Sequence, residues 1–254
     1  MASLAAWCGT PSVTNTCLLT IMPGVYNIGS NYILIPQYVD VAGSGPAVTK
    51  IQGLDTVEFV NEGGKEWYHG IVRMNGGNLR DITIEALGAL YDDPYAIEVR
   101  ESAKIENVTA ISREGGSPIY VWTQGSGQNP QPQLVGKDVE MNNVTVLVPT
   151  PTECTYGIEV NRTESLVIRD SKVEIGECAG CTCGGGITVS TTNGISAIHD
   201  TSVTAPVYGF AKGTVGANVV GLFDMTVAAP YPLVGTGFKC YDVVDGALDP
   251  VSCQ

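Results

Sequence analysis

Basic residues are scarce in this sequence. Its 254 residues include 13 lysines and arginines against 26 aspartates and glutamates, which gives a formal net charge of −13. This deficit argues against a nucleic-acid-binding protein, because such proteins neutralise phosphates with clustered Lys and Arg. The longest apolar runs, such as 219–222, are far shorter than the roughly 20 residues of a membrane-spanning helix. Hydrophobic residues still make up 44% of the chain, which predicts a soluble globular protein with a substantial core.

Amphipathic helices are also lacking. Almost no segment places apolar residues at i, i+3, i+4 and i+7 over three turns, and Gly, Pro, Asn and Thr interrupt each candidate. Short β-branched runs bounded by Gly, Pro or Asn are frequent instead, for example 18–21, 32–35, 38–41 and 48–51. The sequence therefore predicts an all-β fold.

One four-residue pattern recurs along the chain: an Asp or Asn, then a variable residue, then Thr, Lys or Ser, and then an apolar residue. Its copies begin at Asp81, Asn107, Asn143, Asp170, Asp200 and Asp224. A second short strand precedes most copies, at 70–73, 96–99, 118–121, 157–160 and 186–189. A helix-free unit of two or three strands is typical of a right-handed parallel β-helix, in which coils stack about 4.8 Å apart. The alternative fold is a Greek-key sandwich, which would have hairpin turns about every 8 to 12 residues.

The repeat also predicts where its side chains point. Ile and Val face the interior, while the intervening Thr, Lys and Ser face outward. The leading Asp or Asn occupies a corner, where it tolerates left-handed backbone and stacks into ladders. The extra residues of the longer units lie mostly at one corner, at 86–95, 112–117, 148–156 and 176–185, and once elsewhere at 124–133. We expect this corner to be the binding side.

We expect a single solenoid domain over 1–254. Residues 1–53 form the N-terminal cap and first coils, 54–230 the regular coils, and 231–254 a C-terminal capping tail. The segment 1–7 lacks the basic and apolar regions of a secretory signal, so we expect that an export signal is absent from this chain.

Eight cysteines, an even number, suit an oxidising compartment, which predicts an exported protein located outside the cell or at its surface. Cys8 with Cys17 and Cys240 with Cys253 are local pairs near the two ends of the chain. We predict that these disulfides pin the terminal segments over the open strand edges of the solenoid.

The other four cysteines lie close together in the sequence. Cys154 and Cys183 each precede the glycine of a unit by three residues, so stacked coils would bring their Cα atoms to about 5 Å, which suits a disulfide. Cys178 would then pair with Cys181. Pairing of Cys154 with Cys178 or with Cys181 is the open alternative. A zinc site or a redox pair is the competing interpretation, which the spacing disfavours because only 178–181 has the Cys-x-x-Cys form.

Candidate catalytic residues are few. Only His69 and His199 could serve a Ser-His-Asp triad, and His199 occupies a repeat position held by other residue types in other units, so we interpret it as structural. An Asp-Asp pair flanked by tyrosines could serve carbohydrate chemistry, which needs carboxylates about 5 to 9 Å apart, or form a weak calcium contact. Apart from this weak calcium contact, we predict no cofactor. The candidate ligand-binding residues are Tyr91, Asp92, Asp93, Tyr95, Tyr120 and Trp122.

Both ends of the chain resemble one family. The stretch 18–29 (LLTIMPGVYNIG), followed by 38–45 and 48–53, is similar to the opening of bacterial pectin-lyase-like right-handed β-helix proteins. The segment 237–253 looks like the closing segment of exported members that have no assigned activity. The resemblance implies the β-helix fold and says little about function.

The enzymes of this family carry motifs that the sequence lacks. Pectin methylesterases are similar through 23–26 (PGVY), but Ile28 replaces their usual acidic residue, and their Gln, Asp and Arg catalytic set has no counterpart. Of the polygalacturonase motifs only Asp92-Asp93 matches, and the pectate lyase segments are missing. We therefore expect a non-catalytic extracellular scaffold or adhesin that assembles into an oligomer or filament and contacts a partner such as a glycan. The alternative is a polysaccharide-active lyase or hydrolase, or a carbohydrate-binding protein, acting at the insertion corner.

Overall fold

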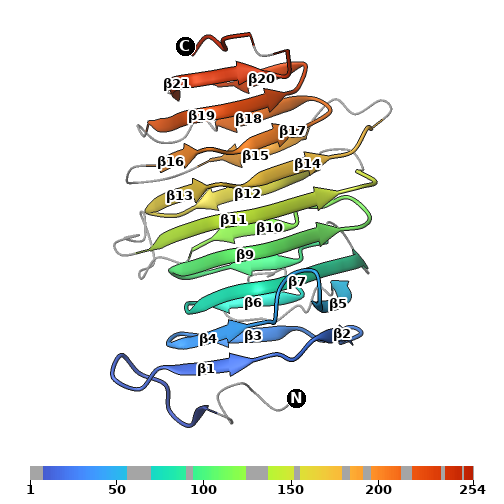
Figure 1. Cartoon of the computed structure of the whole chain (residues 1–254), viewed down its shortest axis with the longest axis vertical. Helices are drawn as coiled ribbons and strands as arrows, with labels where there is room; N and C mark the ends of the chain where they lie inside the picture. Colours follow the sequence, from blue (N-terminus) through green and yellow to red (C-terminus); the bar gives the residue numbers. More distant parts are fainter. Residues whose placement is uncertain are drawn as a thin grey trace, which may run out of the picture.

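Parallel strands wind into stacked coils along the chain, with the N-terminus at one end of the stack and the C-terminus at the other (Figure 1). The computed structural model describes residues 8–55, 70–89, 94–123, 137–151, 155–178, 184–190, 196–212, 219–235, 238–247 and 249–253. All pairings between named strands in these ranges are parallel. The fold is a right-handed parallel β-helix, as the sequence predicted.

The described strands form two sheets. An eight-stranded sheet, which we call the site sheet, contains β3 (Ile33–Pro36), β6 (Val72–Asn75), β8 (Ile97–Val99), β10 (Ile119–Trp122), β12 (Tyr156–Arg162), β15 (Gly185–Val189), β18 (Tyr208–Lys212) and β20 (Tyr231–Val234). A thirteen-stranded sheet, the ladder sheet, contains β1 (Cys17–Thr20), β2 (Gly24–Asn27), β4 (Val39–Ala42), β5 (Thr49–Asp55), β7 (Asn78–Ala89), β9 (Ala103–Ser112), β11 (Asp138–Val148), β13 (Ser165–Arg169), β14 (Lys172–Ile175), β16 (Ser196–His199), β17 (Ser202–Thr204), β19 (Val220–Ala228) and β21 (Phe238–Asp245).

The core fills the cylinder between the two sheets. Strand residues alternate between the interior and the outer face, and the interior positions are Ile, Val, Leu and Met. In the ladder sheet, Ile82, Val108 and Val144 lie in register on successive coils, and none is exposed. No helix in the described ranges is long and apolar enough to cross a bilayer.

The repeated Asp or Asn turns the chain through a corner of the ladder sheet. All six predicted positions have left-handed backbone, with φ between 45° and 57°, which confirms the prediction. A seventh copy, Asp242 with φ 54°, was missed because the residue two places later, Val244, is apolar.

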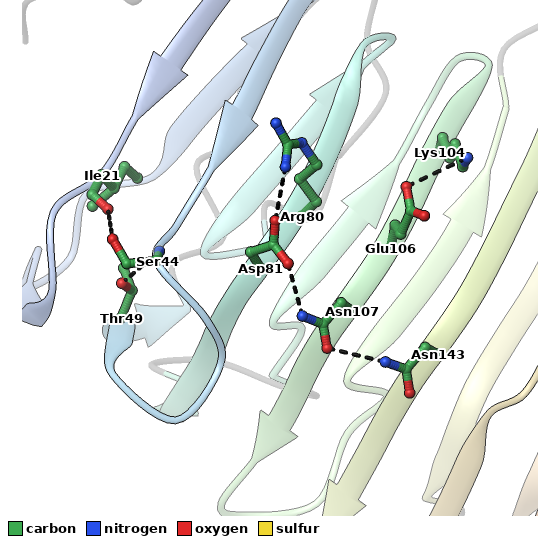
Figure 2. A network of polar contacts seen from close by, with 9 residues as sticks. All are labelled: Ile21, Ser44, Thr49, Arg80, Asp81, Lys104, Glu106, Asn107 and Asn143. Carbon is green, nitrogen blue, oxygen red and sulfur yellow. Dashed lines mark hydrogen bonds and ion pairs between the residues drawn. The ribbon is translucent and has the colours of Figure 1, made fainter.

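At the first three of these corners the side chains form a ladder of hydrogen bonds (Figure 2). Asn107 Nδ2 donates to Asp81 Oδ1 over 2.7 Å, and Asn143 Nδ2 donates to Asn107 Oδ1 over 3.0 Å. Arg80 Nη1 donates to Asp81 Oδ2 over 2.8 Å, which closes the N-terminal end of the ladder. The ladder ties three successive coils together at a position where the backbone itself is constrained.

We expect Asn107→Ala to lower the free energy of unfolding by about 2–3 kcal/mol. It removes both ladder bonds, and alanine at positive φ lacks the polar side chain that helps asparagine adopt left-handed backbone. Asn107→Gly loses the bonds but relieves the backbone, so its cost should be about 1–2 kcal/mol. Urea denaturation measures both. Asn142→Ala is the matched control at a neighbouring position, and a loss as large as that of Asn107→Ala would contradict the account.

Disulfides fasten both ends, as predicted. Cys8 and Cys17 are joined with their Cα atoms 5.6 Å apart, and Cys240 and Cys253 with theirs 5.8 Å apart. The C-terminal tail folds back on β21, where Val251 N–H donates to Val243 O. Cys178 is also disulfide-bonded, whereas Cys154, Cys181 and Cys183 lie outside the described residues, so the predicted pairing of that cluster stays a prediction. The disulfides indicate an oxidising environment.

The insertions differ from the prediction in one respect. β7 continues to Ala89, so the first residues of the predicted insertion 86–95 are strand and not loop. The reason is pairing, because Ala86 lies opposite Ser112 of β9 and Ala89 opposite Asp55 of β5. The connections that follow β7, β9, β11 and β14 lead from the ladder sheet to the site sheet. The predicted insertion at 124–133 lies outside the described residues.

Candidate functional site

A row of polar side chains crosses the outer face of the site sheet. Arg73 on β6, Glu98 on β8, Tyr120 on β10 and Glu159 on β12 lie in register on four successive coils. Each follows an inward-facing Val or Ile, so the two-residue period of a strand turns all four outward. Outward positions of a solenoid are normally solvated, yet Glu98 and Tyr120 are buried. Neighbouring segments therefore cover this part of the face.

Glu98 and Arg100 form a buried ion pair at one side of the row. Glu98 is 1% exposed and Arg100 3%. Arg100 donates from Nε to Glu98 Oε1 over 2.5 Å, and its Nη2 also contacts Oε1. Burial raises the pKa of the Glu98 carboxyl, although Arg100, Arg73 and the Gly70 N–H each lower it. A desolvated carboxyl beside a cation is the kind of perturbed group that gathers at functional sites.

Three aromatic side chains lie together over the middle of the row. The ring centroids of Tyr95 and Tyr120 are 4.7 Å apart, and those of Tyr120 and Trp122 are 6.3 Å apart. The two tyrosines are buried, whereas Trp122 is 37% exposed. Burial raises the pKa of Tyr120, so its hydroxyl stays protonated over the physiological range. Trp122 thus offers an accessible ring beside a packed aromatic pair.

The structure unites only part of the predicted ligand-binding set. Tyr95, Tyr120 and Trp122 come together. Tyr91, Asp92 and Asp93 lie outside the described residues, and so does His69. Tyr95 is held by β5 of the ladder sheet, because its backbone N–H donates to Asp55 Oδ2 over 2.8 Å.

Glu159 is held in one orientation beside these rings. Ser117 Oγ donates to its Oε2 over 3.0 Å, and Asn161 Nδ2 donates to its Oε1 over 2.8 Å. The same Asn161 nitrogen lies 3.2 Å from the Tyr120 hydroxyl. The two donors fix the position of this half-buried side chain. Such a carboxylate can accept a proton from a bound ligand.

Sequence reasoning missed Glu98, Arg100 and Glu159. The available signal was the repeated Ile-Glu-Val of 97–99 and 158–160, with Ile-Tyr-Val at 119–121 between them. These triplets predict strands, and nothing in them shows that Glu98 is buried or that Ser117 and Asn161 hold Glu159.

A hollow of about 400 Å³ opens at the Arg100 end of the row. Three of its lining side chains are basic, and one acid, Glu101, forms an ion pair with Lys137 there. The lining residues are Gln37, Arg73, Asn75, Arg100, Glu101 and Lys137. The hollow is therefore locally basic on a strongly acidic protein.

A second buried carboxylate, Glu85, lies on the ladder sheet and is separate from this site. Its side chain is 1% exposed and is bonded by Lys50 Nζ over 2.7 Å and by Arg113 Nε. Burial alone would raise the pKa of Glu85, but the two cations together lower it. The ion pairs bridge β5, β7 and the end of β9, so we interpret them as structural.

The lowered pKa of Glu85 predicts a loss of stability in acid. A carboxyl whose pKa is lower in the folded state contributes stability above its ordinary value of 4.5, and this contribution disappears as the pH falls through the folded-state pKa. We expect Glu85→Gln to remove that part of the pH dependence and to flatten the acid side of the profile. Chemical denaturation of both proteins between about pH 3 and 7 tests this prediction. Equal acid slopes in both proteins would contradict it.

His199 behaves as the repeat position predicted. It lies opposite Phe223 of the next coil, its ring stacks on Phe223 at 4.5 Å, and Phe223 stacks on Tyr241 at 4.9 Å. In the part of the chain that the structure describes, no group of three or more His, Cys, Asp and Glu side chains is placed to hold a metal ion.

The fold matches solved structures across nearly the whole chain. Carrot pectin methylesterase aligns with a TM-score of 0.55 at 15% identity, over 95% of this chain and 84% of that one. Pectin methylesterase PemA from Erwinia chrysanthemi aligns with 0.59 at 11% identity, over 98% and 86%. A pectin methylesterase in complex with a hexasaccharide aligns with 0.58 at 10% identity, over 99% and 87%. No family model and no curated protein matches the sequence. At these identities the matches show the pectin-lyase-like β-helix fold.

The expectation of a non-catalytic scaffold, adhesin or filament is corrected by these findings. The solved structures that share the fold are enzymes named for their action on pectin. The expectation depended on enzyme motifs that the sequence lacks, and the fold is shared with these enzymes at only 10 to 15% identity, so a missing motif does not argue for a scaffold.

Proposed function

We propose that this protein is a polysaccharide-active enzyme whose substrate lies across the outer face of β8, β10 and β12. Glu159 is the carboxylate that exchanges a proton with the substrate, and Trp122 is the platform against which a sugar ring packs. The observation that carries the proposal is the fixed position of Glu159, held by Ser117 and Asn161 beside an exposed aromatic ring. The fold shared with pectin methylesterases supports it.

The chemistry follows from the groups at hand. A general base must be ionised, oriented and within reach of the proton that it takes. Glu159 accepts hydrogen bonds from two donors and is half-buried, so it meets the requirement of orientation. Aromatic rings bind the apolar faces of sugars, and Trp122 presents such a ring on the neighbouring strand. Either hydrolysis or elimination can use this arrangement, and a carbohydrate-binding protein without turnover is the second candidate.

Incubation with a panel of polysaccharides tests the proposal. Pectin, de-esterified pectin, alginate and a neutral glycan are treated with the protein, and new reducing ends, unsaturated products and released methanol are measured separately. We expect products from at least one member of the panel. Binding without any product would support the carbohydrate-binding candidate, and neither binding nor product would reject both.

The cell compartment follows from the same proposal. An enzyme that acts on a polysaccharide meets its substrate outside the cytosol, and the end disulfides suit an oxidising location. We therefore infer that the protein is exported and works outside the cell. Association into an oligomer stays a prediction of the sequence.

A further inference from the structure

The hollow beside β6 and β8 contains a group of basic residues and borders the buried Glu98–Arg100 ion pair. The proposed reaction uses neither of them. The lining of the hollow includes three of the chain's 13 basic residues, Arg73, Arg100 and Lys137. One of them, Arg100, is buried and is bonded to the buried Glu98. Glu98 is too deeply covered to touch a substrate, so its position calls for another role.

Cations gathered in a concave site attract an oxyanion. A guanidinium presents five N–H donors in a planar fork that fits carboxylate, sulfate and phosphate groups. The protein as a whole repels anions because of its charge of −13, so a local group of three cations is the place where an oxyanion would be held. Lys137 shares its charge with Glu101, which leaves the two arginines as the main donors.

An oxyanion in the hollow would compete with Glu98. Both would draw on the Arg100 guanidinium, and two negative groups beside one buried cation repel each other in a medium of low dielectric. Protonation of Glu98 removes this repulsion. Among the described residues, the other charged or titratable groups around Glu98 are Arg73 on β6 and Tyr120 on β10, with Glu159 on β12 beyond Tyr120.

We propose that the hollow binds an oxyanion and that binding is coupled to the uptake of one proton by Glu98, because the ligand and the Glu98 carboxylate compete for Arg100. The proton comes from solvent and no covalent bond changes. Linkage then requires that the anion binds more tightly at low pH and that the bound anion makes Glu98 harder to ionise. The inference does not depend on turnover.

Calorimetric titration with sulfate, which keeps its charge over the range used, tests the coupling. We expect the Kd for sulfate to rise with pH above the ordinary glutamate value of 4.5, by at most about tenfold per pH unit, the limit for one proton. Titrations in two buffers of different ionisation enthalpy should show net proton uptake. Absence of sulfate binding to the folded protein, or binding with a Kd that does not change with pH, would overturn the proposal.

Variants locate the proton. Glu98→Gln should bind sulfate with a Kd that is independent of pH, whereas Glu101→Gln, which changes the acid that lines the hollow, should keep the slope. Lys137→Gln should weaken binding and also keep the slope, and it serves as the test if Glu98→Gln does not fold. A slope that survives in folded Glu98→Gln, or that vanishes in Glu101→Gln, would overturn the assignment.

Two further ligands identify the source of the oxyanion. Galacturonate carries a sugar carboxylate, and galactose is its neutral counterpart. Binding of galacturonate with the same pH slope, without binding of galactose, would assign the hollow to an acidic sugar, and binding of sulfate alone would assign it to an inorganic oxyanion. Proton-coupled binding in a protein that turns over no polysaccharide would reject the proposed enzyme and leave this inference standing.

Discussion

Glu159→Gln lowers kcat on the productive polysaccharide by about 10²- to 10⁴-fold, the usual contribution of a positioned acid or base. The amide keeps the shape of the side chain and can still contact Ser117 and Asn161, but it cannot accept a proton in the reaction. We therefore expect the fold and the KM to change little. Steady-state kinetics on the substrate found by the panel measures both parameters.

Glu106→Gln is the matched control for this prediction. It makes the same change of charge on an outward glutamate of β9, on the ladder sheet, where Glu106 forms only an exposed pair with Lys104. Its kcat should equal that of the unmodified protein. Full activity in Glu159→Gln, or equal losses in the two variants, would contradict the assignment of Glu159.

Arg100→Gln lowers the free energy of unfolding by about 3–5 kcal/mol near neutral pH, because it leaves the Glu98 carboxylate buried without its cation. The loss should shrink as the medium becomes acidic. The pKa of Glu98 is raised by burial, so protonation stabilises the folded state at low pH, and that contribution is lost as the pH rises through the folded-state pKa. Urea denaturation at acidic and neutral pH measures the difference.

The control for Arg100→Gln is Arg169→Gln. Arg169 pairs with Glu140 over 3.4 Å, and both side chains are nearly half exposed, so the change should cost at most about 0.5 kcal/mol. If Arg100→Gln is equally mild at neutral pH, the Glu98–Arg100 pair is not a desolvated ion pair and the proton-coupled hollow loses its basis.

The architecture could be predicted from the sequence because it depends on local rules. Asp81, Asn107 and the later copies occupy corners where short polar side chains tolerate left-handed backbone, so they recur on the successive coils from β7 to β21. Asp242 escaped notice because its unit has valine in place of the usual outward polar residue. The end disulfides were equally local, since each joins cysteines 9 or 13 residues apart.

The site could not be predicted because it depends on contacts between coils. Alternation correctly turns Glu98 and Glu159 outward, but an outward glutamate is normally solvated. Glu98 is buried only because Tyr120, Arg100 and neighbouring segments cover it, and the Ser117 that orients Glu159 lies 42 residues away in the sequence. The predicted pair Tyr120 and Trp122 lies on the same sheet face as Glu98 and Glu159, since aromatic residues on an outward strand position are visible in the sequence. The charged residues beside them became visible only once the coils were stacked.

The most direct test of the proposed function is a crystal structure of the Glu159→Gln protein with a pectin-derived oligosaccharide. The account predicts sugar density on the outer face of β8, β10 and β12, with one ring packed on Trp122 and a sugar atom within hydrogen-bond distance of the residue at 159. Sugar density over the ladder sheet, or an empty site sheet in crystals soaked at saturating oligosaccharide, would contradict it.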